Sequence, residues 1–188
     1  MSSLDRSFLL LDRDGVLCAD RPDFVKSPTE LEPLSGVAEA LGLLTAAGVR
    51  TAVITNQSCI GRGLVTRTEV DEINAALSTQ LSVCGGRIER FFLCPHAPDA
   101  GCMCRKPSPG LILEARAAFD FDPTRTWLVG DDLRDIEAAR RAGCRPALVL
   151  TGKGTRNLRL AHGVPKFVDL ADFCAFLLAG SHPSLGES

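Results

Sequence analysis

The sequence predicts an α/β fold, a parallel β-sheet covered by helices. Two observations support this class: short apolar runs rich in strand-forming residues recur along the chain, and segments with helical periodicity separate them. Strands that alternate with helices of this length form right-handed βαβ units, which build a parallel sheet. Because 188 residues fit one domain with a sizeable core, we expect residues 1–188 to form a single domain.

The individual elements follow from local patterns. Five apolar runs are predicted as strands: Phe8–Leu11, Thr51–Ile54, Phe91–Leu93, Trp127–Val129 and Ala147–Leu150. Four segments are predicted as helices: Val37–Gly48, with Gly48 as the stop; Thr66–Leu81, opened by a capping box at Thr66 and Glu69; Pro109–Phe119, with Ser108 as N-cap; and Leu133–Ala142, closed by Gly143. The tail 181–188, with Gly, Pro and Ser, is expected to be frayed.

Composition excludes several functional classes. The chain carries 21 basic and 23 acidic residues, a formal charge of −2, so no basic excess suggests nucleic-acid binding. No apolar run approaches the ~20 residues that a membrane-spanning helix needs. The first residues lack the basic start and apolar core of a secretory signal. We therefore expect a cytoplasmic protein, most simply a monomer, that binds neither nucleic acid nor membrane.

Two carboxylates follow the first predicted strand. Asp12 and Asp14 stand one residue apart at the end of a buried strand, and Gly15 lets the chain turn directly after them. Burying like charges is costly, and a divalent cation offsets that cost. Mg²⁺ prefers a few carboxylates, with water and substrate phosphate as its remaining ligands. The alternative is a surface turn, in which Asp and Gly are common.

Polar residues also follow the second and fourth predicted strands. After the second strand, the hydroxyl and backbone N–H groups of Thr55–Ser58 could hold phosphoryl oxygens, although a helix cap is the alternative. After the fourth strand comes the acidic run Gly130–Asp135. One of its carboxylates could complete a metal site, and Asp135 could orient ligands or waters around it. Acidic residues at a helix N-terminus are also ordinary capping residues.

Two cations precede the third predicted helix. Arg105 and Lys106 are electrostatically unfavourable at a helix N-terminus, but they are well placed to neutralise a phosphate. In open α/β sheets, ligands bind beyond the carboxyl ends of the strands. Four polar signals in order, each after a predicted strand, therefore indicate one phosphate site.

A separate metal site is predicted within the loop 94–107. Its candidate ligands are Cys94, His96, Cys102 and Cys104. Three thiolates and one imidazole form a closed tetrahedral set, which suits structural rather than catalytic Zn²⁺. Zinc would order a loop with few apolar residues and place the two cations that follow it. The other cysteines are scattered, which favours a reduced protein over a disulfide framework.

This ordered set resembles the haloacid dehalogenase (HAD) superfamily of phosphotransferases. The motifs that match are Asp12-x-Asp14-Gly15, Thr55, Lys106, and Gly130-Asp131-Asp132 with Asp135. The resemblance covers residues 7–150 and implies a Rossmann-like sheet without a large cap domain. It implies that Asp12 forms an aspartyl-phosphate, and that Asp14 protonates the leaving oxygen and then activates water. Thr55 and Lys106 would hold the phosphoryl group, and Mg²⁺ would be bound by Asp12, the main-chain carbonyl of Asp14, and Asp131.

The zinc loop narrows the resemblance to the branch of heptose 1,7-bisphosphate 7-phosphatases and histidinol-phosphate phosphatases. The run Thr55–Gly63, with its Ser58 and its Arg-Gly ending, is similar to the heptose enzymes. The implied function is removal of the C7 phosphate from D-glycero-D-manno-heptose 1,7-bisphosphate, a small phosphorylated sugar used in making cell-surface polysaccharide. The resemblance also implies these substrate contacts: Asp20, Arg21, Pro22, Asp23, Asn56, Gln57, Ser58, Arg105 and Asp132.

Two departures from the heptose enzymes keep other readings open. Cys59 stands where they commonly have Gly, and Asp132 stands where they often have Lys or another residue able to contact substrate. A carboxylate at Asp132 would repel a second phosphate unless the metal or Arg134 compensates. Histidinol phosphate or another small phosphomonoester is therefore the alternative substrate.

An alternative of another class is a non-catalytic binding module held together by zinc, although such a module would be expected to have lost the catalytic groups. A polynucleotide 3′-phosphatase would need a basic groove, and a response-regulator-like receiver would leave the zinc ligands unexplained.

Overall fold

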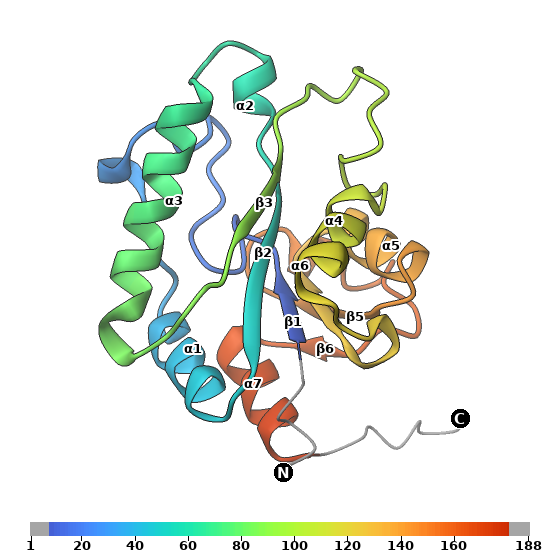
Figure 1. The fold of residues 1–188 in the computed structure, drawn as a ribbon. Coiled ribbons are helices and arrows are strands. Elements are labelled where there is room, and N and C mark those ends of the chain that lie inside the picture. Colours follow the sequence, from blue (N-terminus) through green and yellow to red (C-terminus); the bar gives the residue numbers. More distant parts are fainter. Residues whose placement is uncertain (1–7, 181–188) are drawn as a thin grey trace.

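The computed structural model describes residues 8–180, and the predicted frayed tail lies outside them. Six parallel strands form one sheet in the order β3-β2-β1-β4-β5-β6 (Figure 1). The strands are β1 (Phe8–Leu11), β2 (Arg50–Asn56), β3 (Phe91–Cys94), β4 (Trp127–Gly130), β5 (Arg145–Val149) and β6 (Lys166–Phe167). The predicted α/β class is confirmed.

Helices cover both faces of the sheet. One face carries α1 (Val37–Ala46), α3 (Arg67–Leu81) and α7 (Leu170–Leu178), and the other carries α4 (Gly110–Phe119) and α5 (Leu133–Arg141) (Figure 1). The short elements are α2 (Ser58–Gly61), α6 (Gly154–Asn157), and the 3₁₀ turns η1 (Pro28–Glu30), η2 (Ser82–Cys84) and η3 (Pro123–Arg125). Within residues 8–180, every helix is too short or too polar to cross a bilayer.

Alternate residues of β1 supply the two halves of the core. Leu9 and Leu11 pack with residues of α1, α3 and α7, whereas Phe8 and Leu10 pack with residues of α4 and α5. All four are buried, which explains why this central strand is a continuous apolar run. Fully burying one leucine side chain contributes roughly 1.5–3 kcal/mol, so β1 is a firm anchor for the residue that follows it, Asp12.

Helix α4 begins later than the sequence predicts. Pro109 is its N-cap and Gly110 its first residue, so the prediction of Ser108 as N-cap is wrong. The chain here folds back on the loop that precedes it: Gly110 N–H donates to the Met103 carbonyl at 3.1 Å, and a Cβ on Gly110 would lie only 2.3 Å from that oxygen. The capping box at Thr66 and Glu69, by contrast, is confirmed.

The strand order reverses at β1, which pairs with β2 on one side and with β4 on the other. In open α/β sheets, ligands bind at such a switch point, in the crevice beyond the carboxyl ends of the strands. Asp12 directly follows β1 and Asp131 directly follows β4. Two predicted metal ligands therefore meet where the topology places a ligand site.

Candidate active site

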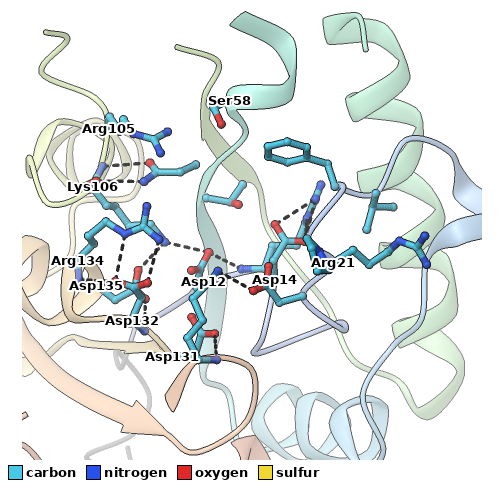
Figure 2. Close-up of a pocket in the computed structure, with 18 residues that line it drawn as sticks. Asp12, Asp14, Arg21, Ser58, Arg105, Lys106, Asp131, Asp132, Arg134 and Asp135 are labelled. Carbon is cyan, nitrogen blue, oxygen red and sulfur yellow. Dashed lines mark hydrogen bonds and ion pairs between the residues drawn. The ribbon is translucent and has the colours of Figure 1, made fainter. Parts of the chain in front are cut away.

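A cavity of about 220 Å³ opens beyond the carboxyl ends of β1, β2 and β4 (Figure 2). The predicted residues that line it are Asp12, Asp14, Asp20, Arg21, Pro22, Thr55, Asn56, Ser58, Arg105, Lys106, Asp131 and Asp132. Two predicted substrate contacts are not part of its lining. Asp23 is exposed and paired with Lys26, and Gln57 is buried and bonded to Thr55.

Lys106 is the cationic centre of the cavity. Its ammonium group lies 2.9 Å from Asp12 Oδ1 and 2.6 Å from Asp135 Oδ1, and it donates to the Ile54 carbonyl at 2.7 Å. Burial alone would lower the pKa of Lys106, but the two carboxylates raise it to about 12. The amine is therefore charged at neutral pH, with one positive charge facing two carboxylates.

Three carboxylates gather at the switch point. One oxygen from each of Asp12, Asp131 and Asp135 lies within 4.8 Å of the others. Burial, opposed by Lys106 and reinforced by the two neighbouring carboxylates, raises the pKa of Asp12 to about 8. Burial also raises the pKa of Asp131 to about 6. Lys106 supplies a single positive charge for the three, so a divalent cation that prefers oxygen ligands fits this donor set.

Asp14 lies beside this centre with its carboxylate firmly held. Oδ1 accepts from Arg13 Nε at 3.1 Å and from Arg13 Nη2 at 2.9 Å, and Oδ2 accepts from Gln57 Nε2 at 2.7 Å. Arg13 is itself buried, although it stands between the two aspartates of the motif. The side chain of Asp14 remains 22% exposed and lines the cavity, so it can still meet a ligand.

The segment that follows β5 holds Asp131 in place. The backbone N–H of Lys153 donates to Asp131 Oδ2 at 2.6 Å, and Asn157 Nδ2 donates to the Asp131 carbonyl at 3.0 Å. Gly15 and Gly152 lie against the same carboxylate, where a Cβ would come within 2.2 and 2.1 Å of Asp131 Oδ2, respectively. Gly15, predicted only as a turn residue, therefore also makes room for Asp131.

Two further ion pairs line the cavity. Asp132 Oδ2 lies 2.9 Å from Arg134 Nη2, and Asp20 Oδ2 lies 2.6 Å from Lys153 Nζ. Burial alone would raise the pKa of Asp132, but the donors of Arg134 lower it. The carboxylate expected to repel a second phosphate is thus neutralised by its neighbour. Arg105 donates to the His96 carbonyl at 3.3 Å and has no carboxylate partner among residues 8–180.

Several residues of the site were not predicted. Asp135 was expected only to orient ligands, yet its carboxylate belongs to the central group. The cavity lining also includes Arg13, Phe24, Val25 and Lys153. Lys153 had a usable signal, because Thr151–Gly154 is a polar, Gly-containing run directly after a predicted strand. Arg13 could have been suspected because a cation stands between the two aspartates.

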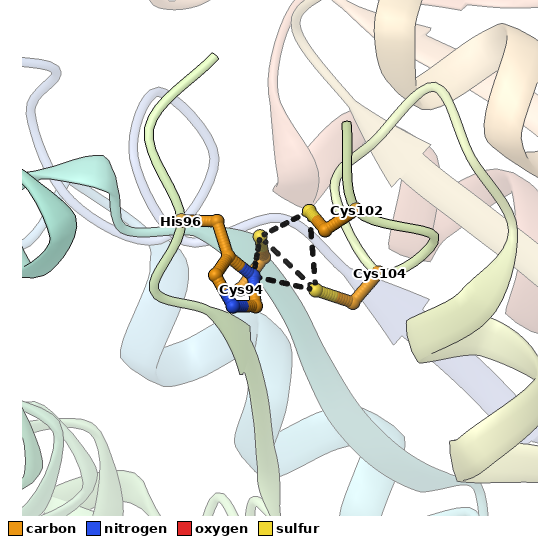
Figure 3. Close-up of side chains that lie close together, drawn as sticks. All are labelled: Cys94, His96, Cys102 and Cys104. Atoms are coloured by element: carbon orange, nitrogen blue, oxygen red, sulfur yellow. Dashed lines mark hydrogen bonds between the residues drawn. The ribbon is translucent and has the colours of Figure 1, made fainter. Parts of the chain in front are cut away.

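The predicted zinc ligands converge in the loop 94–107 (Figure 3). The Sγ atom of Cys104 lies 3.2 Å from Cys94 Sγ, 3.5 Å from Cys102 Sγ and 3.2 Å from His96 Nδ1. Zn–S bonds of about 2.3 Å place tetrahedral sulfur atoms ~3.8 Å apart, so the four donors surround a point suited to one zinc ion. All eight cysteines are free of disulfide bonds.

Similarity to known proteins agrees with this geometry. Residues 103–173 match the HAD-hydrolase-like family. A D-glycero-β-D-manno-heptose-1,7-bisphosphate 7-phosphatase from Neisseria meningitidis is 43% identical over 175 residues, which cover 90% of this chain and 94% of the relative. The chain belongs to the HAD-like family of heptose bisphosphate phosphatases.

Other members of this family match along nearly the whole chain. The Pseudomonas aeruginosa 7-phosphatase is 41% identical, covering 93% of this chain and 99% of its own. A crystal structure of the D,D-heptose 1,7-bisphosphate phosphatase from B. bronchiseptica, complexed with magnesium and phosphate, has a TM-score of 0.90 at 39% identity, covering 93% of this chain and 99% of that one. The Burkholderia thailandensis enzyme has a TM-score of 0.72 at 34% identity, covering 92% and 99%. The predicted HAD resemblance is confirmed.

Proposed function

We propose that this chain is a Mg²⁺-dependent phosphatase that removes the 7-phosphate of D-glycero-β-D-manno-heptose 1,7-bisphosphate. The observation that carries the chemistry is the buried cluster of Asp12, Lys106, Asp131 and Asp135 at the switch point. The choice of substrate is supported by heptose bisphosphate phosphatases that are 40–43% identical over most of the chain.

Asp12 would be the nucleophile. A carboxylate attacks a phosphate poorly because both groups are negative, so the site must reduce their repulsion. The ammonium group of Lys106 lies 2.9 Å from Asp12 and is fixed by Asp135 and the Ile54 carbonyl, so its charge is already in position. An oxygen of Asp12 would bond to phosphorus as the bond from phosphorus to the sugar oxygen breaks.

Asp14 would move the proton. In its acid form it donates a proton to the leaving sugar oxygen, which departs as the alcohol. As a carboxylate it then accepts a proton from the water that attacks the aspartyl-phosphate, which releases inorganic phosphate and restores Asp12. The position of Asp14 supports this role, because Asp14 lines the same cavity as Asp12 and lies two residues further along the chain.

The remaining residues would bind the cation and the substrate. Asp12, Asp131 and the main-chain carbonyl of Asp14 would hold Mg²⁺, which when bound neutralises the negative charge of the phosphoryl group. The fit rests on three neighbouring carboxylates, of which two, Asp12 and Asp135, are paired with the single ammonium group of Lys106. Thr55 would hold the phosphoryl oxygens with Lys106. The proposed substrate contacts that line the cavity are Asp20, Arg21, Pro22, Asn56, Ser58, Arg105 and Asp132.

Zinc would have a structural role, because the protein supplies all four donors and leaves no position for substrate.

Eight free cysteines and a thiolate-rich metal site fit a reducing compartment, which supports a cytoplasmic location. We also propose that the protein is a monomer that does not bind nucleic acid; light scattering on the purified protein would test the first part.

Phosphate release by the purified protein with Mg²⁺ tests the proposed function. We expect a higher kcat/KM for heptose 1,7-bisphosphate than for histidinol phosphate. We also expect Asp12→Asn to lose orders of magnitude in turnover while it unfolds at a similar temperature. Full phosphatase activity in Asp12→Asn would refute the assignment of Asp12 as nucleophile. A higher kcat/KM for histidinol phosphate would make that compound the assigned substrate in place of heptose 1,7-bisphosphate.

A further inference from the structure

Gln57 connects two residues of the site without reaching the cavity itself. It follows β2 as the N-cap of α2, and its side chain is almost fully buried. Its amide nitrogen donates to Asp14 Oδ2 at 2.7 Å and to Thr55 Oγ1 at 2.8 Å. Because an amide group carries two N–H donors, both bonds can be made at the same time. One buried amide therefore contacts both the aspartate and the threonine of the site.

The amide oxygen of Gln57 is also engaged. It accepts from Arg13 Nη2 at 3.0 Å, and the Cys59 thiol lies 3.6 Å away. These contacts determine which way the amide faces, because Arg13 and the thiol need an acceptor and Asp14 needs a donor. Gln57 thus cannot rotate its amide by half a turn without losing several bonds.

Arg13 completes the support and is anchored from outside the site. Its Nη1 donates to Asn74 Oδ1 at 3.1 Å, and Asn74 is a buried residue of α3. Arg13 therefore joins Asp14 to a core helix, while Gln57 joins Asp14 to the end of β2. The orientation of Asp14 is set by two elements that are distant in sequence, and not only by its place after Asp12.

We propose that Gln57 is a positioning residue that orients the Asp14 carboxyl group for proton transfer, with the Thr55 hydroxyl as its second target. This inference rests on the proposed function, in which Asp14 acts on the leaving oxygen. It replaces the expectation that Gln57 contacts substrate. A side chain that has no access to the cavity acts on the reaction only through the residues it holds.

The chemical step shows what such positioning would change. An Asp12 oxygen bonds to phosphorus, the bond from phosphorus to the leaving oxygen breaks, and that oxygen takes its proton from Asp14. A sugar alcohol is a poor leaving group and needs this proton, whereas p-nitrophenolate leaves readily without it. Misplacing Asp14 should therefore slow the transfer from a sugar phosphate far more than the transfer from p-nitrophenyl phosphate.

The experiment compares kcat/KM for heptose 1,7-bisphosphate and for p-nitrophenyl phosphate in wild type and Gln57→Met. The ratio kcat/KM includes departure of the leaving group but excludes hydrolysis of the phosphoenzyme, which is common to both substrates. Methionine has a similar length and no N–H donor. We expect about a 10²-fold loss on the sugar phosphate and only a few-fold loss on the aryl phosphate, since general acid catalysis contributes about 10²–10⁴-fold.

Two further variants keep the test decisive. Gln57→Leu also lacks the N–H donors and adds no charge beside Asp14, so it should show the same selective loss and would decide the case if Gln57→Met did not fold. Gln80→Met makes the same substitution at an exposed glutamine of α3, so its ratio of kcat/KM between the two substrates should match wild type. Equal losses on both substrates, or no loss on either, would overturn the role of Gln57. If wild type failed on the heptose substrate, the proposed function would fall, and the same comparison with any alkyl phosphate that is hydrolysed would still test Gln57.

Discussion

Lys106 is the residue at which the buried charges of the site converge. Its side chain is 3% exposed and contacts the carboxylates of Asp12, which follows β1, and Asp135 in α5, while the carbonyl of Ile54 accepts a third bond from it. Burying a charged amine is costly in lost hydration, and these three acceptors offset that cost only while all of them remain. Asp12 in turn depends on it, because burial raises the pKa of Asp12 and Lys106 opposes that effect.

Replacing this amine should affect stability and catalysis together. We expect Lys106→Met to lower the free energy of unfolding by about 3–5 kcal/mol, because removing one partner leaves buried carboxylates without compensation. Activity should fall by orders of magnitude, because no fixed charge would remain next to Asp12. Urea denaturation and phosphate release measure the two effects.

The double variant Lys106→Met/Asp135→Asn separates the effect on stability from the effect on activity. It removes one of the stranded carboxylates, so it should recover part of the stability while activity stays low. A double variant no more stable than Lys106→Met would show that the loss does not come from uncompensated charge.

Residue types at strand ends could be predicted, but their mutual contacts could not. Asp12, Asp14, Thr55, Lys106 and Asp131 could be named as candidates because each follows a predicted strand or precedes a predicted helix, and all five line the cavity. The hydrogen bond from Thr151 Oγ1 to the Gly15 carbonyl joins positions 136 residues apart, and a local sequence pattern cannot predict such a bond. A local pattern also cannot predict which polar side chains at a strand end are buried. Gln57 was expected to contact substrate, but it is not part of the cavity lining.

At the scale of elements, the zinc loop and the end of β2 hold Lys106 and Arg105 to different degrees. Asn56 exchanges two hydrogen bonds with the backbone of Lys106, at 3.0 and 3.1 Å. Arg105 is held by one bond to the His96 carbonyl, within the zinc loop. Loss of zinc should therefore displace Arg105 more than Lys106.

The variant Cys104→Ser tests this difference. Zinc content, measured by mass spectrometry, should fall, and KM for the bisphosphate should rise about tenfold or more, while kcat changes less. The rise in KM would reflect the freed Arg105, and the retained kcat would reflect the Lys106 backbone, which is still bonded to Asn56. Cys84→Ser is the matched control, because Cys84 is exposed and outside the cluster. An unchanged KM after verified zinc loss would contradict this role.

The elements that escaped prediction are short or lack contrast between polar and apolar positions. β6 has two residues, and α2 and α6 have four each, too few to show a period. α7 reads Leu-Ala-Asp-Phe-Cys-Ala-Phe-Leu-Leu, in which apolar residues lie on all sides. The five longer strands, however, were predicted nearly in place, since burial on both faces gives each of them a run of apolar residues.

For the molecule as a whole, a formal charge of −2 gives no long-range attraction for a bisphosphate. The attraction must be local, and the cations that line the cavity with Lys106 are Arg13, Arg21, Arg105, Arg134 and Lys153. Most of them are paired with aspartates, as Arg134 is with Asp132. The substrate therefore meets a site whose charges are largely balanced. The exceptions are Arg105, which has no carboxylate partner among residues 8–180, and the excess of negative charge among the carboxylates at the switch point.

The excess of buried carboxylates at the switch point should make the stability of the whole protein depend on pH. The pKa of Asp12 rises from its ordinary 3.8 to about 8 on folding, mainly through burial. Between these values the folded protein retains a proton that the unfolded chain has lost, so the stability of the magnesium-free protein falls as pH rises through this range. Mg²⁺ binds the ionised carboxylates and opposes that loss.

We therefore expect the gain in Tm on adding Mg²⁺ to increase from about pH 6 to about pH 8, the interval between the pKa values of Asp131 and Asp12. Thermal unfolding with and without Mg²⁺ measures it. In Asp131→Asn the gain should be small at every pH, because a ligand is missing. Asp71→Asn, which changes an exposed acid on α3, should behave as wild type. A gain that stays constant with pH would mean that Mg²⁺ does not stabilise the protein by displacing protons from these buried carboxylates.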